Sequence, residues 1–180
     1  MITLDKFFDA DLSDVRLGIF KDWFFDSDKV VNEKCMDAVR FLESRGATVV
    51  EITIPHLQQM SMSHGIKISS EFAMGWDNYF SNASSSRHME PNTKITIALG
   101  STMTALEVIA AEKMRAWAFK YVTEELFAKH QLTAIVNPTI GILPPHISED
   151  AKINGESNTP LVVQLMKYIF LANFLGFYKN

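Results

Sequence analysis

The sequence is poor in the residues that build several common kinds of functional site. Its 180 residues include a single cysteine, Cys35, which excludes an internal disulfide framework and a cysteine-rich zinc site. The 17 Lys and Arg residues are outnumbered by 21 Asp and Glu residues and form no cluster. This charge pattern argues against a nucleic-acid-binding stripe and a polybasic membrane patch, so we expect no nucleic-acid partner.

Long hydrophobic runs are also missing. No apolar segment reaches the roughly 20 residues that a membrane-spanning helix needs. The most apolar stretch, residues 161–177, is interrupted by Gln164 and Lys167, and we expect a buried helix there. The N-terminus has acidic residues early and lacks the apolar region of a secretory signal. These features favour an intracellular protein without a transmembrane segment, and peripheral contact with a membrane stays open as an alternative.

Familiar catalytic and cofactor motifs are absent from the sequence. It contains no glycine-rich phosphate loop, no GxSxG nucleophile turn and no Ser-x-x-Lys motif. The five histidines are scattered and none has the spacing of a helical zinc site, while Cys35 falls on an apolar helix face. We therefore expect no metal and no cofactor. Considered residue by residue, the sequence predicts an α/β domain and no catalytic group.

The first third of the chain contains the strongest structural pattern. Alternating apolar residues predict a strand over 15–20, and a second strand is expected over 48–54. Between them lies an amphipathic helix that Ser27 or Asp28 can cap and that Gly46 terminates. A strand–helix–strand unit of this length predicts two parallel strands joined by a right-handed crossover.

The rest of the chain is predicted to be mainly helical. Residues 56–80 have a helical pattern in which Gly65 and Gly75 argue against one continuous rod, and residues 81–93 are loop-like. Thr104 and Glu107 have capping-box spacing and open a long helix that runs to about Lys129. A third strand is expected over 132–136, followed by a Gly/Pro loop and a last helix over 159–176.

Several of these segments, taken in order, resemble parts of the amidase signature hydrolases. They are residues 15–24 (VRLGIFKDWF), 33–37, 49–55 and 135–141, where Asn137 stands in a turn in which the family usually has threonine. Residues 154–158 and 168–177 are most similar to the plant-type fatty acid amide hydrolases, or N-acylethanolamine amidohydrolases. The resemblance implies a partial, C-terminal amidase domain over 15–177. Residues 1–14 show no clear likeness, and 178–180 form a divergent tail.

This resemblance implies an α/β fold in which part of a mixed sheet is flanked by many helices, here one βαβ unit plus long helices. The family hydrolyses amides with a Ser–cisSer–Lys triad, which lies in a glycine-rich signature N-terminal to the matched part. This sequence has no Gly-Gly pair, so we expect the triad to lie outside it. The resemblance therefore implies a truncated part of a fatty acid amide hydrolase that has no catalytic residue of its own.

In the complete enzymes, this region supplies part of the wall that binds the acyl group. The resemblance implies the following substrate-binding candidates: Met62, Ile66, Phe72, Met74, Trp76 and Thr139. Family members with carboxylate-bearing substrates carry an arginine near the stretch that corresponds to residues 69–79. This chain has none between Arg45 and Arg87, so the resemblance implies an uncharged, lipid-like acyl amide. The alternative is that the apolar residues are helix core and that Thr139 stabilises a turn.

Three interpretations remain at this point. The chain is a catalytically incomplete part of an amidase-type hydrolase, or a binding or regulatory fragment that pairs with a full-length homologue, or an unrelated soluble α/β domain. A sheet of strands 15–20, 48–54 and 132–136 leaves an open edge and an apolar face. We therefore expect weak solubility or self-association into a homo-oligomer.

Overall fold

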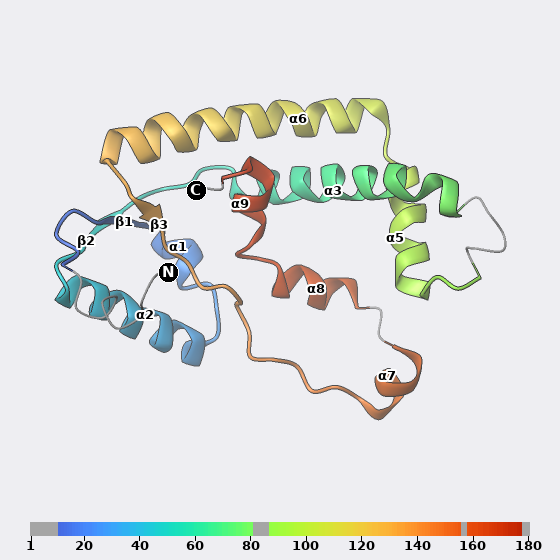
Figure 1. Ribbon diagram of the computed structural model, residues 1–180, viewed down its shortest axis with the longest axis horizontal. Coiled ribbons are helices and arrows are strands. Elements are labelled where there is room, and N and C mark those ends of the chain that lie inside the picture. Colours follow the sequence, from blue (N-terminus) through green and yellow to red (C-terminus); the bar gives the residue numbers. More distant parts are fainter. Residues whose placement is uncertain (1–10, 81–86, 156–157, 178–180) are drawn as a thin grey trace, which may run out of the picture. The chain divides into compact units, whose positions relative to one another are not determined.

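The computed structural model describes residues 11–80, 87–155 and 158–177 (Figure 1). The chain divides into two compact units, each assembled from three separate stretches. The first, here called the sheet unit, comprises Met1–Pro55, Lys120–Pro145 and Gln164–Ile169. The second, the helical unit, comprises His56–Phe119, His146–Val163 and Phe170–Asn180.

The sheet unit is built on the predicted strand–helix–strand pattern. Strand β1 (Arg16–Ile19) leads through the short α1 (Lys21–Phe24) and α2 (Lys29–Ser44) to β2 (Thr48–Glu51). The two strands pair in parallel, with Leu17 opposite Val49, as the sequence predicts. Gly46 adopts a φ of 102°, the left-handed conformation expected of a residue that ends a helix.

Strand β3 (Ala134–Ile135) completes a three-stranded sheet of order β2-β1-β3. It also pairs in parallel with β1, so every strand pair among the described residues is parallel. Arg16 joins the starts of β1 and β3, because its backbone N–H donates to Thr133 Oγ1 (3.1 Å) and its Nε donates to the His130 carbonyl (2.9 Å). The predicted third strand is therefore confirmed, although it is shorter than the pattern suggested.

The hydrophobic core of the sheet unit lies between α2 and the sheet. Ile19, Phe24 and Val39 are almost completely buried, and half-buried side chains of α2, β2 and the end of β3 pack against them. Cys35 is one of these packed side chains, and burial raises the pKa of its thiol. A thiol with a raised pKa is mostly protonated near neutral pH and is a poor nucleophile, which agrees with its predicted role as a small hydrophobic residue.

The helical unit begins with α3 (Leu57–Phe80), which is continuous through both glycines. The sequence argued against one continuous rod here, and that prediction is wrong. An added Cβ at Gly65 or Gly75 would meet nothing within 4 Å, so neither glycine is required by close packing. Their helical cost, about 1 kcal/mol each relative to alanine, is small enough for the remaining contacts of α3 to outweigh it.

The predicted loop of residues 81–93 is partly replaced by a helix, α5 (Pro91–Ser101), while residues 81–86 lie outside the described part. Pro91 occupies the first helical position, where its missing N–H costs nothing.

The capping box that precedes α6 (Ala105–Lys120) is confirmed. Glu107 Oε2 accepts from the Thr104 backbone N–H (2.8 Å), and Thr104 Oγ1 accepts from the Glu107 N–H (3.3 Å). The helix continues without a break as a π-helix, η2 (Tyr121–Ala128).

The C-terminal region contains three short helices: α7 (Glu149–Asn154), α8 (Thr159–Leu165) and α9 (Phe170–Leu175). The prediction of one helix over 159–176 is wrong, because residues 166–169 form turns between α8 and α9.

No single described helix is long and apolar enough to cross a membrane. Residues Pro91–Ser101 and Ala105–Ala128 reach the required length and composition only as a pair, which is bent by 93°.

Candidate functional site

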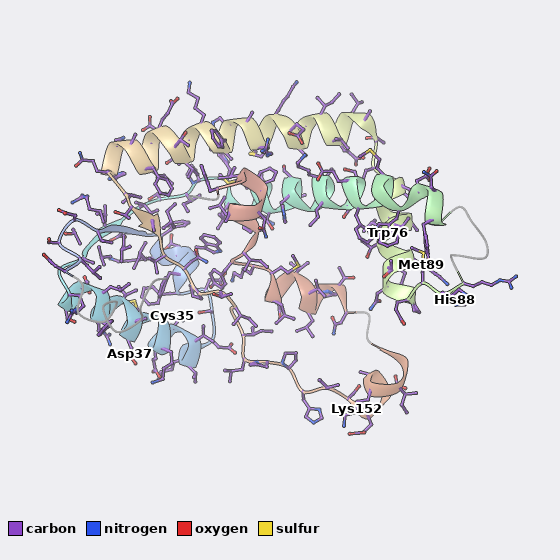
Figure 2. The ribbon with its side chains drawn as sticks, in the orientation of Figure 1. Cys35, Asp37, Trp76, His88, Met89 and Lys152 are labelled. Carbon is purple, nitrogen blue, oxygen red and sulfur yellow. The ribbon has the colours of Figure 1, made fainter. Side chains whose placement is uncertain are left out.

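Helix α3 carries five of the six predicted substrate-binding residues, and their exposure differs. Met62, Met74 and Trp76 are 63%, 76% and 40% exposed, whereas Ile66 and Phe72 are half-buried. Figure 2 labels Trp76 near the C-terminal end of α3. Met62, Met74 and Trp76 are therefore accessible in the described structure, whereas Ile66 and Phe72 are partly covered by neighbouring elements.

The geometry of an α-helix separates these five residues into two groups. At about 100° per residue, Met62, Ile66 and Trp76 fall within about 80° of one another around the axis, and Phe72 lies about 40° beyond Trp76. Met74 lies about 160° from Trp76, on the other side of the helix. The structure therefore places four candidates along one stripe, which we call the α3 stripe (Met62, Ile66, Phe72 and Trp76), and places Met74 outside it.

Helix α5 crosses α3 in the middle of the stripe. An added Cβ at Gly100 would come within 2.1 Å of the Ser69 carbonyl oxygen and 2.8 Å of Ala73 Cβ, so the two helix backbones are in close contact there. Ser69 and Ala73 lie between Ile66 and Trp76 along α3. Met62 and Ile66 thus lie before the crossing, Phe72 lies within it, and Trp76 lies after it.

A row of aromatic rings extends the far end of the stripe. The ring centroids of Phe72 and Trp76 are 6.1 Å apart, and those of Trp76 and Tyr79 are 5.4 Å apart with an edge-to-face angle of 86°. Tyr79 is 43% exposed and was not among the predicted residues. Its position three residues after Trp76 is the signal that could have identified it, because residues three apart are neighbours on a helix surface.

Lys67 and Glu71 of α3 lie away from the stripe, whereas Asp77 lies about 20° from Ile66 around the helix axis. Lys67 is the one Lys or Arg in the sequence of α3, and its Nζ contacts Glu71 Oε1 (2.6 Å) and Glu112 Oε1 of α6 (2.5 Å). The hydrogen bonds that Lys67 donates to Glu112 and Glu71 raise the pKa of its amine, which therefore stays charged and paired. Hence this amine is engaged by protein carboxylates, and the stripe itself consists of uncharged side chains.

Next to this network, His64 is buried among aromatic rings. It is 9% exposed, and its ring centroid lies 6.2 Å from that of Phe170 and 6.0 Å from that of Phe174, both on α9. Desolvation lowers the pKa of the imidazole. The neutral ring therefore packs as part of the interface between α3 and α9.

The sixth candidate, Thr139, belongs to the sheet unit and is exposed in the turn after β3. The preceding Pro138 is fully buried, and Asn137 Nδ2 donates to the Pro138 carbonyl (2.7 Å) and the Tyr168 carbonyl (3.3 Å). These bonds fix the backbone on the N-terminal side of Thr139 while its own side chain remains accessible.

Tyr168 fills the space between the loops that follow β1 and β3. Its hydroxyl lies 2.9 Å from the Trp23 carbonyl oxygen and 2.7 Å from that of Asp26, and its ring is 5.4 Å from that of Trp23. An added Cβ at Gly141 would come within 3.0 Å of the tyrosine ring. Parallel α/β sheets often bind ligands between such diverging loops, at the carboxyl ends of the strands. In this chain Tyr168 occupies that position, so the accessible candidate groups are Thr139 and the α3 stripe.

Within the part of the chain that the structure describes, no group of three or more His, Cys, Asp and Glu side chains could hold a metal ion.

The sequence pattern of the amidase family matches residues 3–178. The chain belongs to the amidase family.

Relatives of this amidase-family chain include two plant proteins named fatty acid amide hydrolase. The protein from Arabidopsis thaliana is 32% identical over 168 residues, which are 92% of this chain and 27% of that protein. The protein from Medicago truncatula is 32% identical over 177 residues, or 97% of this chain and 28% of that protein. The chain therefore spans little more than a quarter of the length of these relatives.

The fold of the amidase-family chain is also similar to that of a solved enzyme. A bacterial aryl acylamidase of the amidase signature family superimposes with a TM-score of 0.69 at 17% sequence identity. The match covers 97% of this chain and 38% of the acylamidase. This likeness confirms the predicted α/β fold class.

Proposed function

We propose that this chain contributes the acyl-binding wall of an amidase-family hydrolase that acts on uncharged, lipid-like acyl amides. The Ser–cisSer–Lys triad is expected from residues outside the chain. The observation that carries the proposal is the α3 stripe, in which Met62 and Trp76 are 63% and 40% exposed on either side of the crossing with α5. The names of the plant relatives point to the same substrate class.

The chemistry of the stripe fits an acyl chain better than a charged substrate. Burial of apolar surface stabilises a complex by roughly 25 cal/mol per Å², and long aliphatic chains offer such surface along their whole length. The Met62 side chain adapts its shape readily, and the Trp76 ring offers a rigid flat face. A substrate carboxylate would need a cation, and Lys67 is already paired with Glu71 and Glu112.

The proposal can be tested by photo-crosslinking with an N-acylethanolamine that carries a diazirine in its acyl chain. We expect crosslinks within Met62–Trp76, and we expect unlabelled N-acylethanolamine to compete at least tenfold better than an N-acylglycine of equal chain length. Trp76→Ala should reduce crosslinking several-fold. Met74→Ala is the matched control, because Met74 lies on the same helix outside the stripe.

Two results would overturn the proposal. One is crosslinking that is spread over the exposed apolar residues of both units and responds equally to Trp76→Ala and Met74→Ala. The other is equal competition by the charged and uncharged acyl amides, which would show that the stripe does not select against a carboxylate.

A further inference from the structure

The methionines of this chain differ widely in how accessible their side chains are. The sequence contains nine, and eight of them lie in the described part because Met1 falls outside it. Among these eight, Met62 and Met74 of α3 are 63% and 76% exposed. The others are buried or half-buried: Met36, Met60, Met89, Met103, Met114 and Met166.

Accessibility decides which methionine a peroxide oxidises. The thioether sulfur attacks one oxygen of hydrogen peroxide and forms an S=O bond, while the O–O bond breaks. The leaving oxygen takes the proton of the transferred oxygen and departs as water, so the sulfur is oxidised to a sulfoxide and the peroxide is reduced. A thioether needs no deprotonation for this step, and the reaction therefore depends on whether the peroxide reaches the sulfur.

The two exposed methionines differ in their position relative to the α3 stripe. Met62 belongs to the stripe, four residues before Ile66, whereas Met74 lies about 120° from Met62 around the helix axis. Met60, two residues before Met62, is 0% exposed. Oxidation at Met60 would place a polar group in the core, but oxidation at Met62 changes an accessible surface and leaves the core intact.

A sulfoxide at Met62 would make the stripe less suited to an acyl chain. Its oxygen is a hydrogen-bond acceptor, and an aliphatic chain that covers it removes water without supplying a donor. The nearby cation of α3, Lys67, is already bonded to Glu71 and Glu112. An acyl chain would therefore leave the oxygen unpaired.

We propose that Met62 is a reversible oxidation site, and that its conversion to the sulfoxide by a peroxide weakens acyl binding at the α3 stripe. The effect on acyl binding rests on the proposed function, which assigns the stripe to the acyl group. Methionine sulfoxide reductases use a dithiol to return the sulfoxide to the thioether, with water and a disulfide as the other products.

The first test treats the folded 180-residue chain with hydrogen peroxide and follows each methionine by peptide mass spectrometry. We expect Met62 and Met74 to be oxidised at least tenfold faster than Met60. Circular dichroism should show that the oxidised chain remains folded. Equal oxidation of Met60 and Met62 in the folded chain, or unfolding on oxidation of Met62, would overturn the proposal.

The second test measures crosslinking of the diazirine-bearing N-acylethanolamine to the stripe before and after peroxide treatment. We expect oxidation to reduce the yield about fivefold to tenfold, and treatment with methionine sulfoxide reductases of both stereochemical classes to restore it. An unchanged yield after complete oxidation of Met62, or a loss that the reductases do not reverse after reducing Met62, would contradict the proposal.

Matched variants assign the effect to one sulfur. In Met62→Leu, which keeps an apolar side chain but has no sulfur, the yield after peroxide should equal the yield of the same variant before peroxide. In Met74→Leu and in Cys35→Ala, which removes the one thiol of the sequence, peroxide should still lower the yield as it does in the unaltered chain. A loss that persists in Met62→Leu, or that disappears in either of the other variants, would overturn the proposal.

Failure of this inference can be distinguished from failure of the proposed function. Selective oxidation of Met62 in a chain whose stripe does not crosslink even before oxidation would refute the function and leave the oxidation site intact. Selective crosslinking to the stripe that oxidation of Met62 does not change would refute the inference and leave the function intact.

Discussion

Trp23, Phe24 and Tyr168 form a buried aromatic group in the sheet unit, where Phe25 and Phe41 are 47% and 49% exposed, whereas the α3 aromatics Trp76 and Tyr79 in the helical unit are both exposed. Trp23, Phe24 and Tyr168 are 5%, 0% and 3% exposed, against 40% for Trp76 and 43% for Tyr79. The Tyr168 hydroxyl is satisfied by backbone carbonyls, and its ring fills the position where a parallel sheet often binds a ligand. The comparison indicates that Trp23, Phe24 and Tyr168 are packed inside the sheet unit, whereas aromatic surface on α3 remains accessible.

The largest effect is expected where α5 meets α3. Gly100→Ala places a Cβ 2.1 Å from the Ser69 carbonyl oxygen, so the helices must separate, and we expect the free energy of unfolding to fall by about 3 kcal/mol. Gly75→Ala is the control, because its Cβ meets nothing within 4 Å, and it should raise stability by about 0.5 to 1 kcal/mol. Urea unfolding followed by circular dichroism measures both. A neutral Gly100→Ala would show that the crossing is not close.

The next largest change in the free energy of unfolding is expected from removing the buried hydroxyl of Tyr168 in the sheet unit. Tyr168→Phe removes the hydroxyl that bonds to the Trp23 and Asp26 carbonyls and should lower the free energy of unfolding by about 1 to 2 kcal/mol. Tyr121→Phe removes a more exposed bond to the Thr53 carbonyl (3.2 Å) and should cost less than about 0.5 kcal/mol. Equal losses in the two variants would contradict the role of Tyr168 as a buried link between loops.

A smaller change in the free energy of unfolding is expected when the pH is lowered. Burial lowers the pKa of folded His64 below 6.5, the usual value that the unfolded chain retains. As the pH falls below 6.5, the unfolded chain takes up this proton first. The stability associated with neutral His64 is therefore full above pH 6.5 and declines from there down to the folded-state pKa. His64→Phe should remove this decline in urea-unfolding titrations, and His88→Gln, at an exposed histidine, should leave it unchanged. Persistence of the decline in His64→Phe would contradict the assignment.

The smallest change in the free energy of unfolding is expected for an exposed side chain of α3, in comparison with a buried side chain of the same helix. Met62→Ala should change the free energy of unfolding by less than about 0.5 kcal/mol, because that side chain is 63% exposed. Met60→Ala, two residues away and 0% exposed, should cost about 2 to 4 kcal/mol. Similar losses at both positions would mean that Met62 is a core residue, and the alternative interpretation of the stripe would then be correct.

Features that depend on neighbouring residues in the sequence were the most predictable. The strand–helix–strand unit, the turn at Gly46 and the capping box of Thr104 and Glu107 all follow local rules and are confirmed. Features that depend on distant contacts were missed. The break between α8 and α9 surrounds Tyr168, whose hydroxyl bonds to backbone more than 140 residues away in sequence, and no local pattern encodes it.

The same distinction applies to the candidate site. Helical spacing placed apolar residues on α3, but spacing alone does not show which side of a helix is covered by its neighbours. The crossing at Gly100 emerged only from the contact between α3 and α5. The separation of Met74 from the stripe and the position of Tyr79 follow from helical spacing and could have been predicted.

The most direct test of the central claim is to treat the purified 180-residue chain with a serine-directed fluorophosphonate and to assay it for N-acylethanolamine hydrolysis. We predict no labelling and no hydrolysis by the isolated chain. Stoichiometric labelling of a serine in the isolated chain would contradict the claim that the chain provides an acyl-binding wall and takes its nucleophile from elsewhere.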